Sequence, residues 1–183
     1  MRARVTSGFT LVELLIATVV LAILVALAAP SMRTALVRQQ VRSAGNDLVA
    51  DVQTARTLAI SRGQRVGVIA NGGDWHAGWQ LQQDASPTAA AYSAASGAPL
   101  RQHGALPADL RIGASRAGTL GLLVFSGDGS VFDTASNARA SADSVFALCQ
   151  PAPTQAQALR VLVHASGQVS SYRDATVSGA DCP

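Results

Sequence analysis

Few residues in this 183-residue chain are of types that commonly act in catalysis or bind metals, and the three histidines are the first candidates. His76, His103 and His164 lie far apart, and none has a second metal-ligating residue at the usual short spacing. The sequence also lacks a G-x-S-x-G nucleophile motif, a P-loop and a G-x-G-x-x-G dinucleotide motif. We therefore expect no catalytic residues, no metal site and no cofactor, and we do not expect an enzyme.

A faint cation-site pattern occurs at Gly127-Asp128-Gly129, which Asp133 follows. Calcium takes six or more oxygen ligands, and this stretch offers only two nearby carboxylates. Glycine and aspartate are also common turn residues. The pattern therefore predicts a tight hairpin turn rather than a calcium site.

The two cysteines, Cys149 and Cys182, both lie late in the chain. In a cytosolic protein they would be two unrelated thiols, whereas in an exported protein they would form a natural pair. The choice between these depends on whether the chain leaves the cytoplasm.

Glu13 is the only glutamate, and it interrupts an apolar run at residues 9–29. A helix of that length spans about 30 Å, the thickness of a bilayer's hydrocarbon core. Arg2 and Arg4 precede the run and favour a cytoplasmic location for the N-terminus. A carboxylate at the bilayer centre costs about 2.5–3.5 kcal/mol, so Glu13 should have a cationic partner. A free amino terminus at Phe9 would supply one.

Two other kinds of N-terminal segment also contain an apolar run. A secretory signal peptide has a shorter apolar region and a small-residue cleavage site after it, whereas here helical sequence continues beyond Pro30. An ordinary signal anchor has a suitable length but does not explain Glu13.

Beyond Pro30 the apolar residues follow the period of an amphipathic helix. They recur at steps of three and four from Val37 to Ala59, and Asp51 and Arg56 are assigned to the opposite, polar face. Gly63 is a candidate C-cap. The pattern predicts one helix over residues 10–62 whose apolar stripe packs on a sheet.

The rest of the chain has the alternation of β-strands. Residues 71–74 are expected to form a hairpin turn, and the Ala/Ser-rich residues 84–99 a mobile loop. The expected strands are 65–70, 78–84, 120–125, 131–132, 145–149, 159–164 and 167–172. A helix followed by antiparallel strands is an α+β fold.

The segment GFTLVEL at residues 8–14 resembles the type III signal of type IV prepilins and type II secretion pseudopilins. The resemblance implies that a prepilin peptidase cuts between Gly8 and Phe9 and methylates the new N-terminus at Phe9. It implies that Glu13 neutralises the amino terminus of a neighbouring subunit during assembly. The implied fold is the type IV pilin-like lollipop, a long N-terminal helix on an antiparallel β-rich head. Its implied parts are a leader at 1–8, a membrane-spanning half at 9–30, an amphipathic half at 31–62 and a periplasmic head at 63–183.

A narrower resemblance is to the GspH/FimT family of minor pilins and minor pseudopilins. The residues that carry it are ARTLAISRG at 55–63, Val66, WHAGW at 75–79 and FSGDG at 125–129. Trp75 and Trp79 within this pattern are expected to pack in the core and to bind no ligand.

The resemblance implies a minor pilin that lies at or near the tip of a type IV pilus and primes its assembly. The alternative is a minor pseudopilin (GspH-like) of a type II secretion system. The implied partners are the prepilin peptidase, the major pilin and other minor pilins through helix packing, and the inner membrane before assembly. The implied location is a single pass through the inner membrane, then an extracellular pilus or periplasmic pseudopilus. Exported minor pilins often close their C-terminal region with a disulfide, which here implies Cys149–Cys182.

A further alternative is a DNA-binding pilin that serves natural transformation. Related pilins bind DNA through a C-terminal G-R-x-R-like motif, but residues 167–170 here lack both arginines. Arg160 and Arg173 are the candidates for a weak DNA contact. Because residues 63–183 hold seven arginines and eight aspartates, DNA is not a favoured partner.

Overall fold

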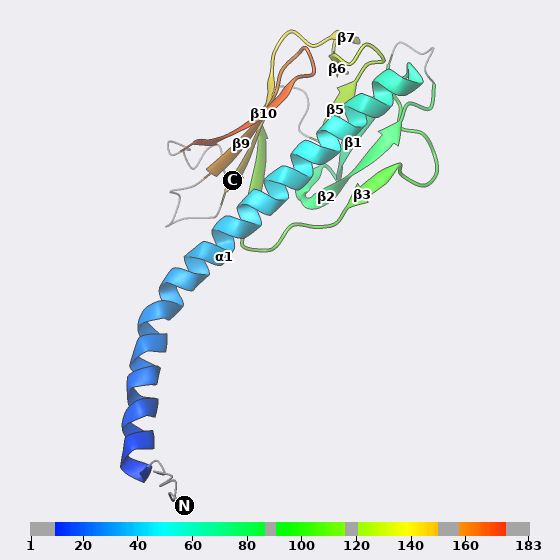
Figure 1. The fold of residues 1–183 in the computed structure, drawn as a ribbon. Coiled ribbons are helices and arrows are strands. Elements are labelled where there is room, and N and C mark those ends of the chain that lie inside the picture. The colour runs from blue at the N-terminus through cyan, green and yellow to red at the C-terminus, as the bar shows by residue number, and fades with distance from the viewer. Residues whose placement is uncertain (1–9, 87–90, 116–120, 150–157, 175–183) are drawn as a thin grey trace, which may run out of the picture. The chain divides into compact units, whose positions relative to one another are not determined.

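The structure, a computed structural model, describes residues 10–86, 91–115, 121–149 and 158–174 (Figure 1). The chain divides into two compact units, Met1–Val37 and Arg38–Pro183. The described part of the first unit is helical. The second unit contains the rest of that helix and all of the described strands.

The helix α1 runs from Leu11 to Arg62, which confirms the prediction of one helix over residues 10–62. It ends where Gly63 adopts a φ of +61°, a left-handed conformation that glycine enters without steric cost. The Gly63 amide donates to the Ile60 carbonyl, and the Gln64 amide donates to the Ala59 carbonyl. These two bonds form a Schellman cap, so the predicted C-cap at Gly63 is confirmed.

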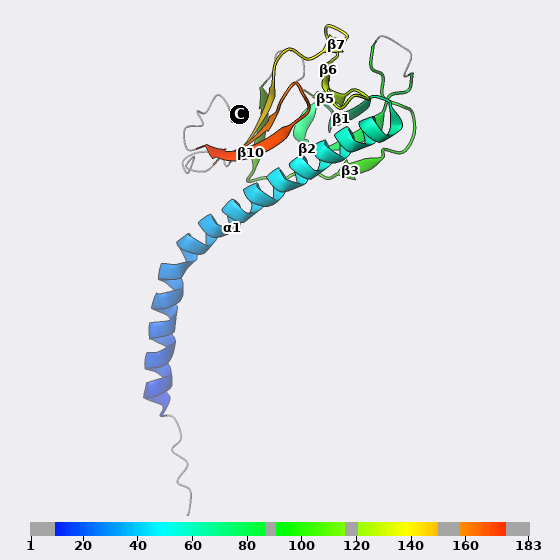
Figure 2. The same cartoon turned by 45° about the horizontal axis from the view of Figure 1, so that its top comes forward.

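In the second unit α1 lies across the strands, as Figures 1 and 2 both show. Its packing face holds the apolar stripe expected from the sequence, and these residues are at most 5% exposed: Val41, Ala44, Leu48, Val52, Ala55 and Ala59. Gly45 brings the helix close to the strands, because a Cβ at that position would overlap the Leu159 side chain. The amphipathic pattern of the sequence therefore identified the packing face correctly.

The strands form two antiparallel sheets. One has the order β3-β2-β1-β5-β6-β7 and the other the order β10-β9-β8-β4. The strand bounds are β1 Val66–Asn71, β2 Asp74–Gln83, β3 Arg101–His103, β4 Arg111–Ser115, β5 Leu122–Phe125, β6 Val131–Asp133, β7 Ala138–Arg139, β8 Ser144–Cys149, β9 Ala158–Val163 and β10 Val169–Asp174. The α+β class, with a helix packed on antiparallel sheets, is confirmed.

The two predicted hairpin turns are present. Gly72 and Gly73 lie at positive φ between β1 and β2. Between β5 and β6, the Ser126 amide donates to the Ser130 carbonyl, and Asp128 Oδ1 accepts bonds from the Ser130 hydroxyl and amide. These bonds from Ser130 hold the pKa of Asp128 below its usual value. Asp128 therefore stabilises the turn.

Three short strands were missed in the sequence, namely β3, β4 and β7. β3 and β7 are edge strands of three and two residues, and their mostly exposed polar side chains give no alternating pattern. The start of β2 was also placed too late, at residue 78. In the structure β2 begins at Asp74, where the register with β1 shifts between Ala70 and Asn71.

The segment predicted as a mobile loop, residues 84–99, is tied to the sheet in its described part by Asp84. The Asp84 Oδ1 atom accepts bonds from the amides of Ser86 and Ser93, at 3.1 and 3.2 Å. Its Oδ2 atom lies 2.6 Å from Arg65 Nε, and its side chain is fully buried. This carboxylate connects the segment to Arg65, the residue that precedes β1.

Candidate functional site

The N-terminal end of α1 carries the predicted assembly residue. Gly8 and Phe9 lie outside the described residues. Thr10 caps the helix, because its Oγ1 atom accepts a bond of 3.3 Å from the Glu13 amide and its carbonyl accepts one of 3.2 Å from Leu14. Glu13 is exposed in the first turn, where a carboxylate also stabilises the helix dipole. The carboxylate is therefore accessible to a partner.

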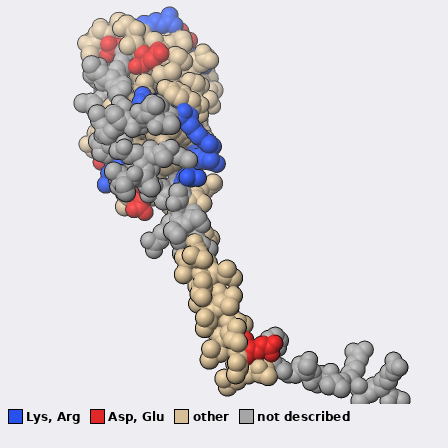
Figure 3. Space-filling model, turned by 90° about the vertical axis from the view of Figure 1, so that its left-hand side faces the viewer, with Lys and Arg blue, Asp and Glu red and all other residues tan. Residues whose placement is uncertain are grey.

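The surface that follows Glu13 is apolar. The large hydrophobic side chains between Leu11 and Leu27 are 50–79% exposed. Figure 3 shows this part of the helix as an uncharged surface interrupted by one acidic group. Within the described residues, no helix combines the length and hydropathy that a membrane crossing requires. The membrane span expected at residues 9–30 stays a prediction.

The two arginines proposed for DNA contact do not lie together. β9 and β10 are paired with Arg173 opposite Leu159 and Tyr172 opposite Arg160. Because successive strand residues point to opposite faces, Arg173 shares a face with Leu159 and Arg160 points to the other face. The register therefore places Arg160 and Arg173 on opposite faces of the hairpin, and the weak DNA contact stays a prediction.

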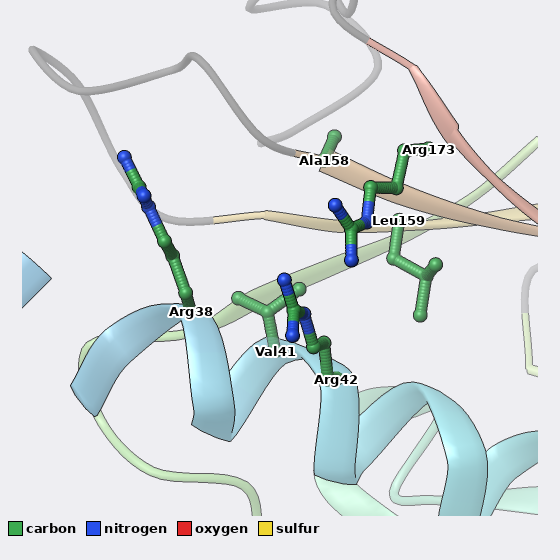
Figure 4. A pocket seen from close by; sticks show the side chains of 6 residues that line it. All are labelled: Arg38, Val41, Arg42, Ala158, Leu159 and Arg173. Carbon is green, nitrogen blue, oxygen red and sulfur yellow. The ribbon is translucent and has the colours of Figure 1, made fainter. Parts of the chain in front are cut away.

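Arg173 instead lies near two arginines of α1. Arg38, Arg42 and Arg173 line a small hollow between the helix and the β9–β10 hairpin (Figure 4). In Figure 4 the guanidinium groups of Arg42 and Arg173 point toward each other, whereas Arg38 extends away from them from the preceding helical turn. Several basic side chains gather on the side of the head that Figure 3 turns to the viewer.

A buried carboxylate, that of Asp51, joins α1 to the six-stranded sheet. Asp51 was assigned to the polar face, but it is 1% exposed. Its Oδ2 atom accepts a bond of 2.8 Å from Trp79 Nε1, and its Oδ1 atom lies 2.6 Å from Arg101 Nε. The His103 ring stacks on Trp79 with 4.1 Å between the ring centroids. Asp51 lies three residues after Leu48, and that spacing was the signal for burial.

Arg56 was also assigned to the polar face, but it is half-buried. Its Nε atom donates a bond of 2.9 Å to the Gly129 carbonyl, which fixes α1 to the β5–β6 turn. Its stem thus contributes to packing while part of its side chain stays accessible.

The tryptophans pack in the core, as expected. Trp75 and Trp79 are 3% and 0% exposed. Trp75 meets Phe146 of the other sheet in an edge-to-face contact, with 4.9 Å between centroids. The pair therefore helps to hold the two sheets together.

The histidines lie in strands or at their ends. His76 is in β2, and His103 is in β3. His164 follows β9 and pairs with Asp143, with 2.9 Å between Nδ1 and the carboxylate oxygen. The described segments bring no three potential metal ligands together.

Cys149, at the end of β8, is 3% exposed. Its proposed partner, Cys182, lies outside the described residues. The part of the chain that the structure describes holds no free thiol. The pairing itself stays a prediction.

Comparison with known proteins identifies the family. Residues 44–167 match the family described as "Type II transport protein GspH". The chain belongs to the GspH family. Residues 4–29 match the motif described as "Prokaryotic N-terminal methylation motif", a range that includes Gly8, Phe9 and Glu13. No curated protein sequence matches this GspH-family chain.

Solved structures with the same fold include two described as a minor pilin or a minor pseudopilin. The type IV minor pilin FimU of Pseudomonas aeruginosa is 23% identical, with a TM-score of 0.56 over 80% of this chain and 94% of FimU. The minor pseudopilin EpsH of the Vibrio cholerae type 2 secretion system is 12% identical, with a TM-score of 0.54 over 78% of this chain and 99% of EpsH. At these identities the likeness establishes the fold of the GspH-family chain. The suspected GspH/FimT-like pilin resemblance is confirmed at the level of family and fold.

Proposed function

We propose that this GspH-family chain is a minor pilin, a low-copy subunit at or near the tip of a type IV pilus that primes assembly. The observation that carries the proposal is the combination of an N-terminal methylation motif at residues 4–29 with a GspH-family head. The role is binding to other subunits rather than catalysis.

The proposed maturation step is cleavage between Gly8 and Phe9 by a prepilin peptidase, followed by methylation of the Phe9 amine. Cleavage leaves a free amine close to the first turn of α1. Before assembly the mature chain would cross the inner membrane once through residues 9–30, with the head in the periplasm. The exposed apolar side chains from Leu11 to Leu27 support this placement, because a surface of that kind needs an apolar environment.

The proposed assembly contact joins Glu13 to the N-terminal amine of a neighbouring subunit. The Glu13 carboxylate is exposed, and the nearby large side chains are apolar. In lipid, an opposite charge on a neighbour would offset the cost of the carboxylate. This contact would favour helix packing with the major pilin and with other minor pilins.

The head would be closed by a disulfide between Cys149 and Cys182. Such a bond would join the C-terminal segment to β8, and the chain-entropy model gives about 3–4 kcal/mol of stabilisation for a loop of this length. An exported location is compatible with the bond.

The alternative function is a minor pseudopilin of a type II secretion system. FimU and EpsH have the same fold at similar TM-scores, so the fold favours neither system. The distinguishing experiment deletes the gene in its native strain and measures surface pili and secreted type II substrates separately. Loss of pili with normal secretion supports the minor pilin, whereas loss of secretion with normal pili contradicts it and supports the pseudopilin.

A further inference from the structure

The Arg38, Arg42 and Arg173 side chains form a basic cluster, here called the arginine cluster, in the second unit. We propose that the arginine cluster binds a phosphate group, carried by a phospholipid headgroup or free in solution. This goes beyond the proposed pilus role, which needs no such site.

The charge of the arginine cluster is not balanced by the other described residues. Arg38, Arg42 and Arg173 form no ion pair with another described residue. By contrast, Arg65 and Arg101 each pair with an aspartate at 2.6 Å. The cluster thus concentrates positive charge that an anion would neutralise.

Two elements, α1 and β10, supply the arginines that line the hollow. Arg38 and Arg42 are four residues apart and so lie on one face of α1. Arg173 faces them from β10, because its register opposite Leu159 turns it to the helix side of the sheet. The packing of α1 and β10 therefore fixes the backbone positions from which these arginine side chains extend.

The size and lining of the hollow limit the shape of the ligand. Val41, Ala158 and Leu159 supply the apolar part of the lining. The hollow has a volume of about 20 Å³, which is room for about one water molecule, so a ligand group would sit at its mouth. A guanidinium fork binds one edge of an oxyanion with two parallel bonds. Two forks on opposite walls need a group with more than one such edge. A tetrahedral phosphate meets this requirement, whereas a carboxylate offers a single edge.

Duplex DNA fits less well than a single phosphate group. DNA binding grows with the number of phosphates that are neutralised along an extended surface. The nearest other arginine of the hairpin, Arg160, points to the opposite face of the sheet. Arg160 therefore does not extend the cluster along the hairpin.

The test uses the full-length protein in neutral detergent micelles. Inorganic phosphate is titrated by calorimetry, and phosphatidylglycerol is titrated in mixed micelles with phosphatidylcholine as the uncharged comparison. Wild type should bind phosphate saturably, and Arg42→Ala and Arg173→Ala should each weaken binding about tenfold or more. Arg173→Lys should also weaken it, because lysine keeps the charge but loses the fork. Saturable phosphatidylglycerol binding identifies a lipid source, and binding of inorganic phosphate alone identifies free phosphate.

The matched control is Arg139→Ala, which removes one exposed arginine from β7 of the other sheet. It should change phosphate binding less than about twofold. Circular dichroism checks that each variant is folded, and Arg173→Lys serves if an alanine variant is not. Three results would overturn the proposal: no saturable binding by wild type, equal weakening by Arg139→Ala and Arg42→Ala, or duplex DNA binding that Arg160→Ala weakens as much as Arg173→Ala.

Discussion

We expect Asp51→Ala to weaken the packing of α1 on the six-stranded sheet. Asp51 is the buried acceptor for Trp79 Nε1, and it pairs with Arg101 of the edge strand β3. Removing the carboxylate leaves the indole N–H of a fully buried tryptophan without its acceptor. It also removes the ion pair that joins α1 to β3.

The size of the effect follows from these two losses. A buried donor without a partner costs about 1–3 kcal/mol. The Arg101 side chain is 53% exposed, so water replaces much of its interaction with Asp51. Loss of the ion pair therefore adds at most about 1 kcal/mol to the cost. The expected loss in the free energy of unfolding is about 1–4 kcal/mol. Asp51→Asn should cost less, because the amide oxygen can still accept the Trp79 bond.

The assay is denaturant unfolding of a soluble head that begins at about residue 33, followed by circular dichroism and tryptophan fluorescence. The matched control is Asp47→Ala, one helical turn earlier, where the side chain is 50% exposed and lies 3.7 Å from His103. That variant should lose less than about 1 kcal/mol. If Asp51→Ala and Asp47→Ala unfold with free energies within about 0.5 kcal/mol of each other, the reasoning about Asp51 is refuted.

Three further predictions concern processing, oxidation and DNA. A bulky residue in place of Gly8 should block maturation. Mass spectrometry of the membrane-extracted protein would then show an intact leader, whereas normal cleavage of that variant would contradict this prediction. Cys149 and Cys182 should resist alkylation without reductant, and Cys182→Ser should lower the melting temperature of the head; labelling of both thiols would exclude the bond. The soluble head should not bind duplex DNA measurably at physiological ionic strength, because it carries too few arginines on one face. A titration that shows micromolar affinity, lost in an Arg160→Ala/Arg173→Ala variant, would contradict that.

The sequence predicted those parts of the fold that depend on local pattern. The period of α1 and its end at Gly63 were visible because a helix has a fixed repeat and a glycine cap. The turns at residues 71–74 and 126–130 were visible because their glycines and aspartates favour turns. These features needed no knowledge of partners distant in the chain.

The remaining features depend on contacts between distant segments. β3 is three residues long, and its pairing with β2 at Trp79 opposite His103 is not encoded in its own pattern. The arginine cluster requires the register that places Arg173 opposite Leu159, which sequence alone did not provide. The burial of Asp51 is different, because its spacing from Leu48 and Ala55 follows the apolar stripe and could have predicted it.

The claim that this chain is a filament subunit is tested most directly by quantitative mass spectrometry of purified filaments. Cells would express wild type and Glu13→Ala at equal levels, with peptides that distinguish the two. We expect the wild-type subunit to be present in filaments with N-methyl-Phe9 at its N-terminus, and the Glu13→Ala subunit to be cleaved but depleted from filaments. Equal incorporation of both subunits, or absence of the wild-type subunit from the filaments, would contradict it.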